Sequence, residues 1–214
     1  MLEVARADGI SKIVLTPHVF RMTRPNRDTK ELKAWMGQFL HETRPPGIEL
    51  FPGAEVSFQS DMIAPIKDLG LTVNGTNYVF IEFPALNLPE DTADFVNRMM
   101  RGDLIPIISH PERNAAFAGS PEILRELVGQ GAISQVTALS LTGGFGRRVR
   151  KTAEDLLRRG LVHVIASDAH NSGSRPPRLS EAVESAARIV GTAKAEAMVT
   201  IVPEAILANE QVPE

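Results

Sequence analysis

The sequence predicts an α/β fold with parallel strands, and three observations support this prediction. Short runs rich in β-branched residues alternate with longer amphipathic stretches along the chain. Several of the short runs, such as residues 13–15, 79–81 and 164–166, are apolar throughout, as in strands that are buried on both faces. Many of the longer stretches end at a glycine, as helices commonly do. Such alternation predicts crossover helices, so an α/β barrel or an open doubly wound sheet is expected.

The individual elements follow from the same pattern. A short β-rich run between turn-forming residues is typical of a strand, and the chain has at least six, at Lys12–His18, Ile48–Ser57, Tyr78–Pro84, Leu104–His110, Ile133–Leu141 and Val162–His170. The stretches between them carry apolar residues at helical spacing. They predict helices at roughly Asp28–Thr43, Asp61–Leu69, Pro89–Arg101, Pro121–Gln130, Arg147–Arg159 and Ser180–Val190.

The two ends of the chain and one loop lie outside this alternation. Residues Met1–Asp8 predict the last turns of a helix that ends at Gly9, with no strand before it. The segment Arg21–Asp28, rich in arginine, proline and asparagine, predicts a long surface loop. The tail after Val202 predicts a short helix and a frayed end. Since no repeat or domain boundary is visible, residues 1–214 are expected to form a single domain.

The composition excludes several classes of function. The 214 residues include no cysteine, which excludes a disulfide framework, a thiolate zinc site and a phosphatase mechanism with a cysteine nucleophile. The formal net charge of -3 gives no overall reason to expect nucleic acid or an anionic membrane as a partner. No apolar run reaches the roughly 18 residues of a membrane-spanning helix, and the first residues lack the layout of a secretory signal. A cytoplasmic protein without membrane insertion is expected.

Five of the six predicted strands end in histidine, glutamate or aspartate, and these residues are His18, Glu55, Glu82, His110, Asp168 and His170. The carboxyl ends of parallel strands lie together on one face, so these side chains should converge. Carboxylates that converge in a partly desolvated site are costly unless cations or protons neutralise them. The sequence therefore predicts a divalent metal site with two or three ions. Oxygen and nitrogen ligands without sulfur suit manganese, iron, zinc or magnesium.

Each of these residues also has a simpler explanation when it is considered alone. A single histidine or glutamate at a strand end is usually a cap or a satisfied polar group, so the metal prediction depends on the whole set. His163 lies inside the apolar run of residues 161–165 and is expected to be a packed, hydrogen-bonded core imidazole. His41 lies on a charged helix face. Neither is assigned to the site.

Two arginines follow these strand ends closely. Arg113 comes just after the fourth strand, and Arg175 lies in the loop after Asp168. Guanidinium groups match the geometry of phosphate, so the pair is predicted to bind a phosphoryl group. The alternative is structural: Arg113 could pair with Glu112 or Asp103, and Arg175 could be a solvated loop residue.

Four strings of residues resemble motifs of the polymerase and histidinol phosphatase (PHP) superfamily. They are Ile-Val-Leu-Thr-Pro-His at 13–18, Pro-Gly-Ala-Glu-Val at 52–56, Ile-Ser-His-Pro-Glu-Arg at 108–113 and Val-Ile-Ala-Ser-Asp-Ala-His-Asn at 164–171, the last followed by Arg-Pro-Pro. Within the superfamily, the chain is most similar to the manganese-dependent protein-tyrosine phosphatases encoded with capsular or exopolysaccharide genes. The strings occur in order across nearly the whole chain, which makes the resemblance specific.

The resemblance implies a fold, a site and a reaction. The fold would be a distorted (β/α)7 TIM-like barrel, the PHP fold, with a trinuclear Mn2+ centre whose ligand positions include all six strand-end residues. Arg113 and Arg175 would bind the phosphoryl group, and His110 or a metal-bound water could protonate poorer leaving groups. The substrate would be phosphotyrosine on the cytoplasmic tail of a bacterial tyrosine autokinase that regulates capsular or exopolysaccharide synthesis and export. We expect hydrolysis by in-line attack of a metal-activated hydroxide.

The chain departs from this family pattern at its start. Family members begin with a strand that carries Asp-x-His-x-His and with a nearby acidic loop, which supply three further ligands. The expectation is therefore an N-terminally truncated PHP-type domain with its first strand missing. Two alternatives stay open. One is a small-molecule phosphomonoesterase of the histidinol-phosphatase type, and the other is a catalytically impaired remnant that lacks the first metal-binding strand.

Overall fold

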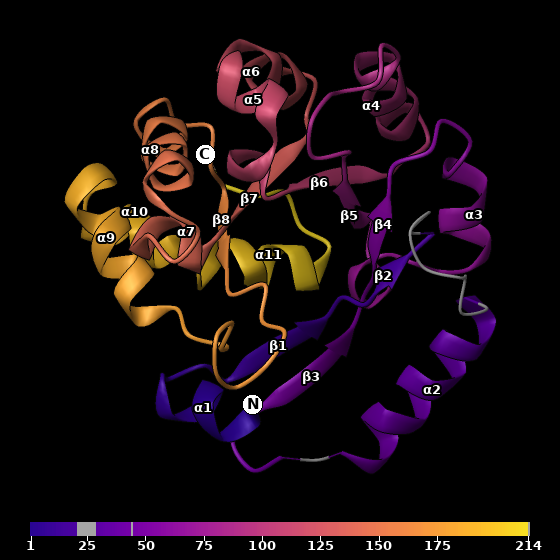
Figure 1. Ribbon diagram of the computed structural model, residues 1–214. Helices are drawn as coiled ribbons and strands as arrows, with labels where there is room; N and C mark the ends of the chain where they lie inside the picture. The colour runs from indigo at the N-terminus through magenta and orange to yellow at the C-terminus, as the bar shows by residue number, and fades with distance from the viewer. Residues whose placement is uncertain (21–28, 44, 214) are drawn as a thin grey trace.

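The structure, a computed structural model, describes residues 1–20, 29–43 and 45–213, so the loop predicted at Arg21–Asp28 lies outside the described residues. Its central feature is a set of parallel strands (Figure 1). They are β1 (Lys12–Leu15), β2 (His18–Val19), β3 (Glu49–Pro52), β4 (Glu55–Ser57), β5 (Tyr78–Glu82), β6 (Ile105–Ser109), β7 (Ile133–Thr137) and β8 (Val164–Ala166). The prediction of an α/β fold with parallel strands is confirmed.

Six strands form one sheet in the order β2-β4-β5-β6-β7-β8, while β1 pairs with β3 in a separate short ladder. The predicted strands Lys12–His18 and Ile48–Ser57 are each interrupted once, between β1 and β2 and between β3 and β4. The first interruption includes Pro17, which has no N–H to donate to a ladder. The second includes Gly53, where an added Cβ would lie 2.8 Å from Cγ1 of Val14. Glycine is therefore required where these two chain segments approach each other.

The helices alternate with the strands as predicted, with small shifts at their ends. They are α1 (Leu2–Ala7), α2 (Thr29–Glu42), α3 (Ile63–Asp68), α4 (Thr92–Arg101), α5 (Ala115–Gly119), α6 (Pro121–Gly129), α7 (Ala138–Thr142), α8 (Arg147–Arg158), α9 (Ser180–Val190), α10 (Thr192–Ala197) and α11 (Ile201–Ala208). Two 3-10 turns are η1 (Val73–Gly75) and η2 (Pro111–Arg113). In the described parts of the chain, no helix is long and apolar enough to cross a membrane.

Two predicted strands end earlier than expected. The strand expected at Val162–His170 ends at Ala166, and the strand expected at Ile133–Leu141 ends at Thr137, where α7 follows at once. The side chain of Glu112, in η2, explains the second change. Its Oε1 accepts a hydrogen bond from the backbone N–H of Thr137 (3.0 Å) and another from the hydroxyl of Ser140 (2.6 Å). N–H groups at the start of a helix have no partner within the helix, so a carboxyl group placed there stabilises a helical turn.

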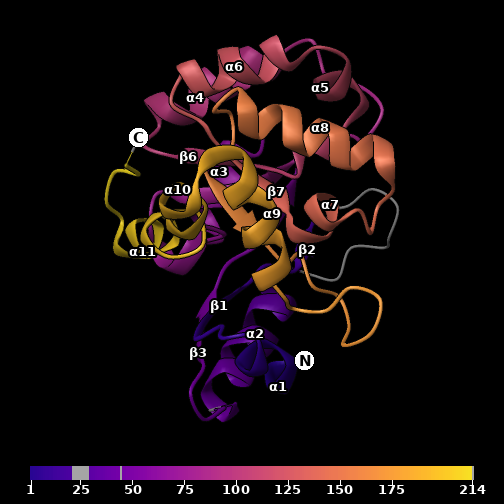
Figure 2. The same cartoon turned by 90° about the vertical axis from the view of Figure 1, so that its left-hand side faces the viewer.

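Two apolar clusters lie on the two faces of the sheet. The larger fills the space between the sheet and the surrounding helices, and Phe95, Phe117 and Leu124 are among its fully buried side chains. The smaller lies on the other face, where Val202 and Ile206 of α11 pack against β5, β6, β7 and β8. Figure 2 shows α1, α2, β1 and β3 projecting from the rest of the molecule. Burial on both faces explains the apolar runs of the strands.

The expectation was a distorted (β/α)7 barrel with its first strand missing, and among the described residues the sheet is open. Among the described residues, β2 pairs only with β4 and β8 only with β7, so these two strands are the edges. A cavity of about 610 Å³ lies between β1 and β8. Its wall includes Leu15 of β1, Val164 of β8, Phe39 of α2 and Leu207 of α11, and it extends to His18 at the carboxyl end of the sheet.

His163 is hydrogen-bonded as predicted but half-buried at the edge of the core, and His41 lies exposed in the last turn of α2. The Nδ1 atom of His163 accepts a hydrogen bond from the backbone N–H of Ser134 (3.1 Å). Burial, together with the positive charge of Lys194, lowers the pKa of His163 to about 4. The neutral imidazole is therefore part of the folded structure.

This burial predicts a pH-dependent loss of stability. The unfolded chain protonates His163 near its ordinary pKa of 6.5, whereas the folded chain does so only near about 4. The stabilising effect is therefore fully present above pH 6.5 and is lost as the pH falls towards 4. At pH 5 the free energy of unfolding should be about 2 kcal/mol lower than at neutral pH because of this residue. In urea unfolding, the free energy of unfolding should fall less between pH 7.5 and pH 5 in His163→Asn than in the wild type. An equal fall in the two proteins would contradict the prediction.

Candidate active site

The parallel register brings three of the predicted metal ligands together. His18 and Glu55 are register partners between β2 and β4, and Glu82 is the partner of Ser57 in the next ladder. Register partners share a face of the sheet, and so do residues two apart on one strand. His18, Glu55 and Glu82 therefore point to one face, where a ligand atom from each lies within 4.8 Å of the other two.

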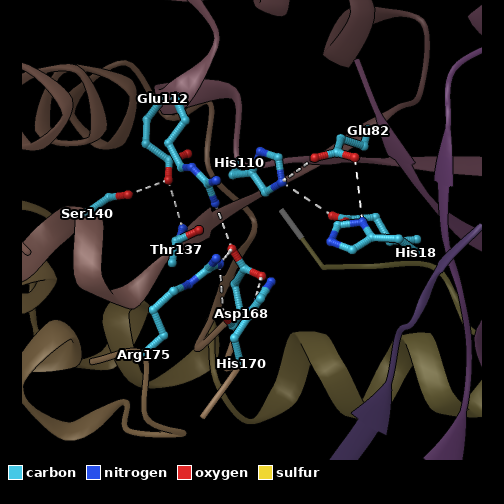
Figure 3. A network of polar contacts seen from close by, with 11 residues as sticks. His18, Glu82, His110, Glu112, Thr137, Ser140, Asp168, His170 and Arg175 are labelled. Carbon is cyan, nitrogen blue, oxygen red and sulfur yellow. Dashed lines mark hydrogen bonds and ion pairs between the residues drawn. The ribbon is translucent and has the colours of Figure 1, made fainter. Parts of the chain in front are cut away.

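His110 joins this group from the next strand end. Its Nε2 lies 3.3 Å from Oε1 of Glu55 and 3.7 Å from Oε1 of Glu82. On the other side, Nδ1 of His18 lies 2.7 Å from Oε2 of Glu55 and 3.5 Å from Oε2 of Glu82. Two imidazoles thus flank two carboxylates (Figure 3). His110 has a left-handed backbone (φ 35°), a conformation that non-glycine residues adopt mainly at constrained or functional positions.

The charges in this group depend on one another. Burial raises the pKa of Glu55, but the contacts with His110 and His18 outweigh burial and hold that pKa below its ordinary value. Burial lowers the pKa of His110, but its contact with Glu55 outweighs burial and raises that pKa above the ordinary value. The Glu55 carboxylate is therefore stabilised as an anion by positive charge close to it.

The same group fits a divalent cation. Nδ1 of His18 is buried and has no regular hydrogen-bond partner among the described residues, although Glu55 Oε2 is only 2.7 Å away. Imidazole nitrogens and carboxylate oxygens that converge on one point in this way are arranged as ligands of a shared ion. Nitrogen and oxygen donors without sulfur suit first-row divalent metals.

Asp168 lies in a second group, with both predicted phosphate-binding arginines. Nη1 of Arg113 donates a hydrogen bond to Oδ2 of Asp168 (2.7 Å). Nη2 of Arg175 donates to the same oxygen and to the backbone carbonyl of Asp168 (3.0 Å). Asp168 has a left-handed backbone (φ 46°) just after β8. The pairing of Arg113 with Glu112 or Asp103 that was considered as an alternative is replaced by its pairing with Asp168.

His170 connects the two groups. Its Nδ1 lies 3.0 Å from the backbone oxygen of Asp168 and 3.6 Å from Oδ1 of that residue. The His170 and His18 rings have their centroids 6.0 Å apart. All eight predicted site residues therefore lie in one region at the carboxyl ends of the strands, as two adjoining groups. The sequence did not indicate that they would divide in this way.

Two further residues of this region were not predicted from the sequence. Glu112 is 2% exposed, burial raises its pKa, and its carboxyl group ties η2 to the start of α7. The ring of Phe145 lies over the guanidinium groups of both Arg113 and Arg175. The sequence signal for Phe145 was a single aromatic residue among glycines, Gly-Gly-Phe-Gly at 143–146. For Glu112 the signal was its place beside Arg113 in the string at 108–113.

Comparison with known proteins identifies the family of this chain. The family model described as capsular polysaccharide synthesis, CpsB/CapC, matches residues 1–208. The chain belongs to the CpsB/CapC family. Among its relatives, a putative tyrosine-protein phosphatase CapC of Staphylococcus aureus is 34% identical over 184 residues, which cover 85% of this chain and 72% of the relative. Tyrosine-protein phosphatase YwqE of Bacillus subtilis (strain 168) is 32% identical over 188 residues, 85% of this chain and 74% of that relative.

The fold also matches a member of the CpsB/CapC family. The match is to a chain from the crystal structures of YwqE from Bacillus subtilis and CpsB from Streptococcus pneumoniae, described as unique metal-dependent tyrosine phosphatases. The TM-score is 0.86 and the sequences are 29% identical, with 99% of this chain and 87% of the other chain covered. The resemblance to capsule-locus tyrosine phosphatases that the sequence motifs indicated is thus confirmed.

Proposed function

We propose that this chain is a metal-dependent protein-tyrosine phosphatase that acts in capsular or exopolysaccharide synthesis. The observation that carries the proposal is the convergence of His18, Glu55, Glu82 and His110 beside two arginines at the carboxyl end of a parallel sheet. Metal ligands next to guanidinium groups suit the hydrolysis of a phosphate ester. The relatives named tyrosine-protein phosphatases support the choice of substrate class.

In this proposal, the four residues of the first group hold one part of a metal centre. Asp168 and His170 hold another part, and Mn2+ is the ion proposed, with iron, zinc and magnesium as the alternatives. When bound, such ions supply an activated water as the nucleophile and neutralise charge on the phosphoryl group. The chain itself orients the ligands, because neighbouring strands in fixed register carry His18, Glu55 and Glu82.

Arg113 and Arg175 would bind and orient the phosphoryl oxygens. Each guanidinium has five N–H donors, and the contacts with Asp168 use only some of them. In the described structure, Nε of Arg175 is buried without a hydrogen-bond partner, so the guanidinium keeps a donor that the contacts with Asp168 do not use. His110 would lie close enough to supply a proton to a poor leaving group, whereas a phenolate needs little such help.

We further infer that the natural substrate is phosphotyrosine on the tail of a bacterial tyrosine kinase and that the enzyme acts in the cytoplasm, where such a tail would lie. The parallel sheet, with its polar groups at the carboxyl ends, would correspond to most of a PHP-type (β/α)7 barrel in a single domain. What supports this inference is the strand order together with the likeness to the solved family structures.

A substrate comparison with protein loaded with Mn2+ tests the proposal. We expect hydrolysis of a phosphotyrosyl peptide at a rate at least about tenfold above that of histidinol phosphate, since phenolate is the better leaving group. Removal of divalent ions with a chelator should abolish turnover, and added Mn2+ should restore it. Turnover that survives chelation would overturn the metal-dependent mechanism. Preference for histidinol phosphate would favour the small-molecule phosphatase, and binding of the peptide without turnover would favour the impaired remnant.

A further inference from the structure

Phe145 contacts both arginines of the site. The centroid of its ring lies 4.9 Å from Cζ of Arg113 and 5.5 Å from Cζ of Arg175. Both distances are within the range of about 6 Å over which an aromatic ring attracts a cation. Arg113 ends η2 and Arg175 lies in the loop after β8, so one side chain meets guanidinium groups from two separate segments.

The segment that carries Phe145 has a defined backbone. Gly143 and Gly146 both have a φ of 90°, which L side chains rarely adopt. At Gly144 an added Cβ would lie 2.9 Å from Cδ2 of Leu139, so the turn packs closely against that side chain. The backbone N–H of Gly144 donates to the carbonyl of Leu139 (2.8 Å), and that of Gly146 donates to Gly143 (2.9 Å). These constraints present the half-buried Phe145 ring from a tight turn.

The turn is also fixed relative to Arg113. It follows α7 directly, and the start of α7 is held by the carboxyl group of Glu112 through Thr137 and Ser140. Glu112 precedes Arg113 in η2. The same buried contact therefore sets the position of the arginine and of the ring that lies over it.

A neutral ring has a chemical advantage at this position. Asp168 accepts hydrogen bonds from both guanidinium groups, and a second carboxylate would compete with an incoming phosphoryl group for the remaining N–H donors. A π-face attracts the cation without accepting those hydrogen bonds along its edge. The arginines are thus oriented while donors stay available.

We propose that Phe145 is a positioning residue that orients Arg113 and Arg175 together for binding the phosphoryl group. The proposal rests on the proposed function of these two arginines. Phe145 need not touch the reacting atoms, because it acts through the guanidinium groups. Removal of its π-face should weaken phosphate binding even when the volume of the side chain is largely kept.

The test compares Phe145→Leu, Phe145→Tyr and Phe39→Leu in protein loaded with Mn2+. Phe39 is the matched control, because it is another half-buried phenylalanine and its ring stacks on Trp35. Phe145→Leu should weaken the binding of inorganic phosphate about tenfold and raise the KM for phosphotyrosine by a similar factor, with kcat changed less. Phe145→Tyr should stay within about twofold of the wild type, since it keeps the ring. Phe39→Leu should bind phosphate as the wild type does.

Calorimetry with inorganic phosphate separates this inference from the proposed function. If Phe145→Leu binds phosphate as tightly as the wild type, the inference is overturned, whatever the activity of the protein. If the wild type fails to hydrolyse phosphotyrosine but the leucine variant still binds phosphate less tightly, the proposed function fails and the inference stands. If phosphate binding is weakened equally in Phe145→Leu and Phe39→Leu, the effect is a general one of losing an aromatic ring, and the inference is also overturned.

Discussion

Replacing Glu55 by glutamine is expected to lower the rate of phosphotyrosine hydrolysis by about a hundredfold or more, because changes around a bound metal commonly cost that much in affinity or activity. Glu55 makes the shorter contacts with both imidazoles, His18 at 2.7 Å and His110 at 3.3 Å, whereas Glu82 lies 3.5 Å and 3.7 Å from them. Glutamine keeps the size of the side chain but loses the negative charge that a divalent ion requires. The affinity for Mn2+, measured by calorimetry, should fall together with the rate.

Glu122→Gln is the matched control for this experiment. Glu122 lies on α6 and its carboxylate pairs with Arg125 and Arg159 on the surface. Exposed ion pairs contribute only about 0 to 1 kcal/mol, so this variant should keep the wild-type rate and Mn2+ affinity. If Glu55→Gln keeps both as well, Glu55 is not a ligand and the proposed composition of the metal centre is wrong.

The positions of the site residues were predictable because they depend on a local pattern and one topological rule. Apolar runs that lead to His18, Glu55 or Glu82 mark strands, and parallel strands bring such positions to one side of the sheet. The structure adds the register, which places His18 opposite Glu55. Register depends on contacts between strands that are distant in sequence, so the pattern of any one strand did not contain it.

The features that were missed depend on contacts across the fold. The strand predicted to reach Leu141 ends at Thr137 because a glutamate 25 residues earlier in the chain caps the turn. Likewise, the division of the site into two groups depends on Asp168 accepting hydrogen bonds from both arginines. The separate β1-β3 ladder also depends on long-range pairing, and strand periodicity says nothing about which edges meet.

The substitution Arg175→Lys is expected to reduce kcat/KM for phosphotyrosine by about a hundredfold, because a single ammonium cannot reproduce the planar donors of a guanidinium at such a site. Nη2 of Arg175 holds the carboxylate and the carbonyl of Asp168, while its Nε is buried and has no partner in the described structure. Lysine preserves the positive charge, so a large loss of kcat/KM would show that catalysis depends on the geometry of the guanidinium and not on charge alone.

Arg178→Lys is the control for this change, because Arg178 lies in the same loop and contributes positive charge near Asp8. Its effect on kcat/KM should be less than about twofold, as expected for a change of exposed charge geometry. A small effect of Arg175→Lys on kcat/KM would mean that positive charge alone is sufficient at this position, contrary to the prediction. Because Asp168 is also a proposed metal ligand, the Mn2+ affinity of Arg175→Lys decides between the two roles. Unchanged affinity with reduced kcat/KM assigns Arg175 to the phosphoryl group, whereas a parallel loss of both assigns it to the orientation of Asp168.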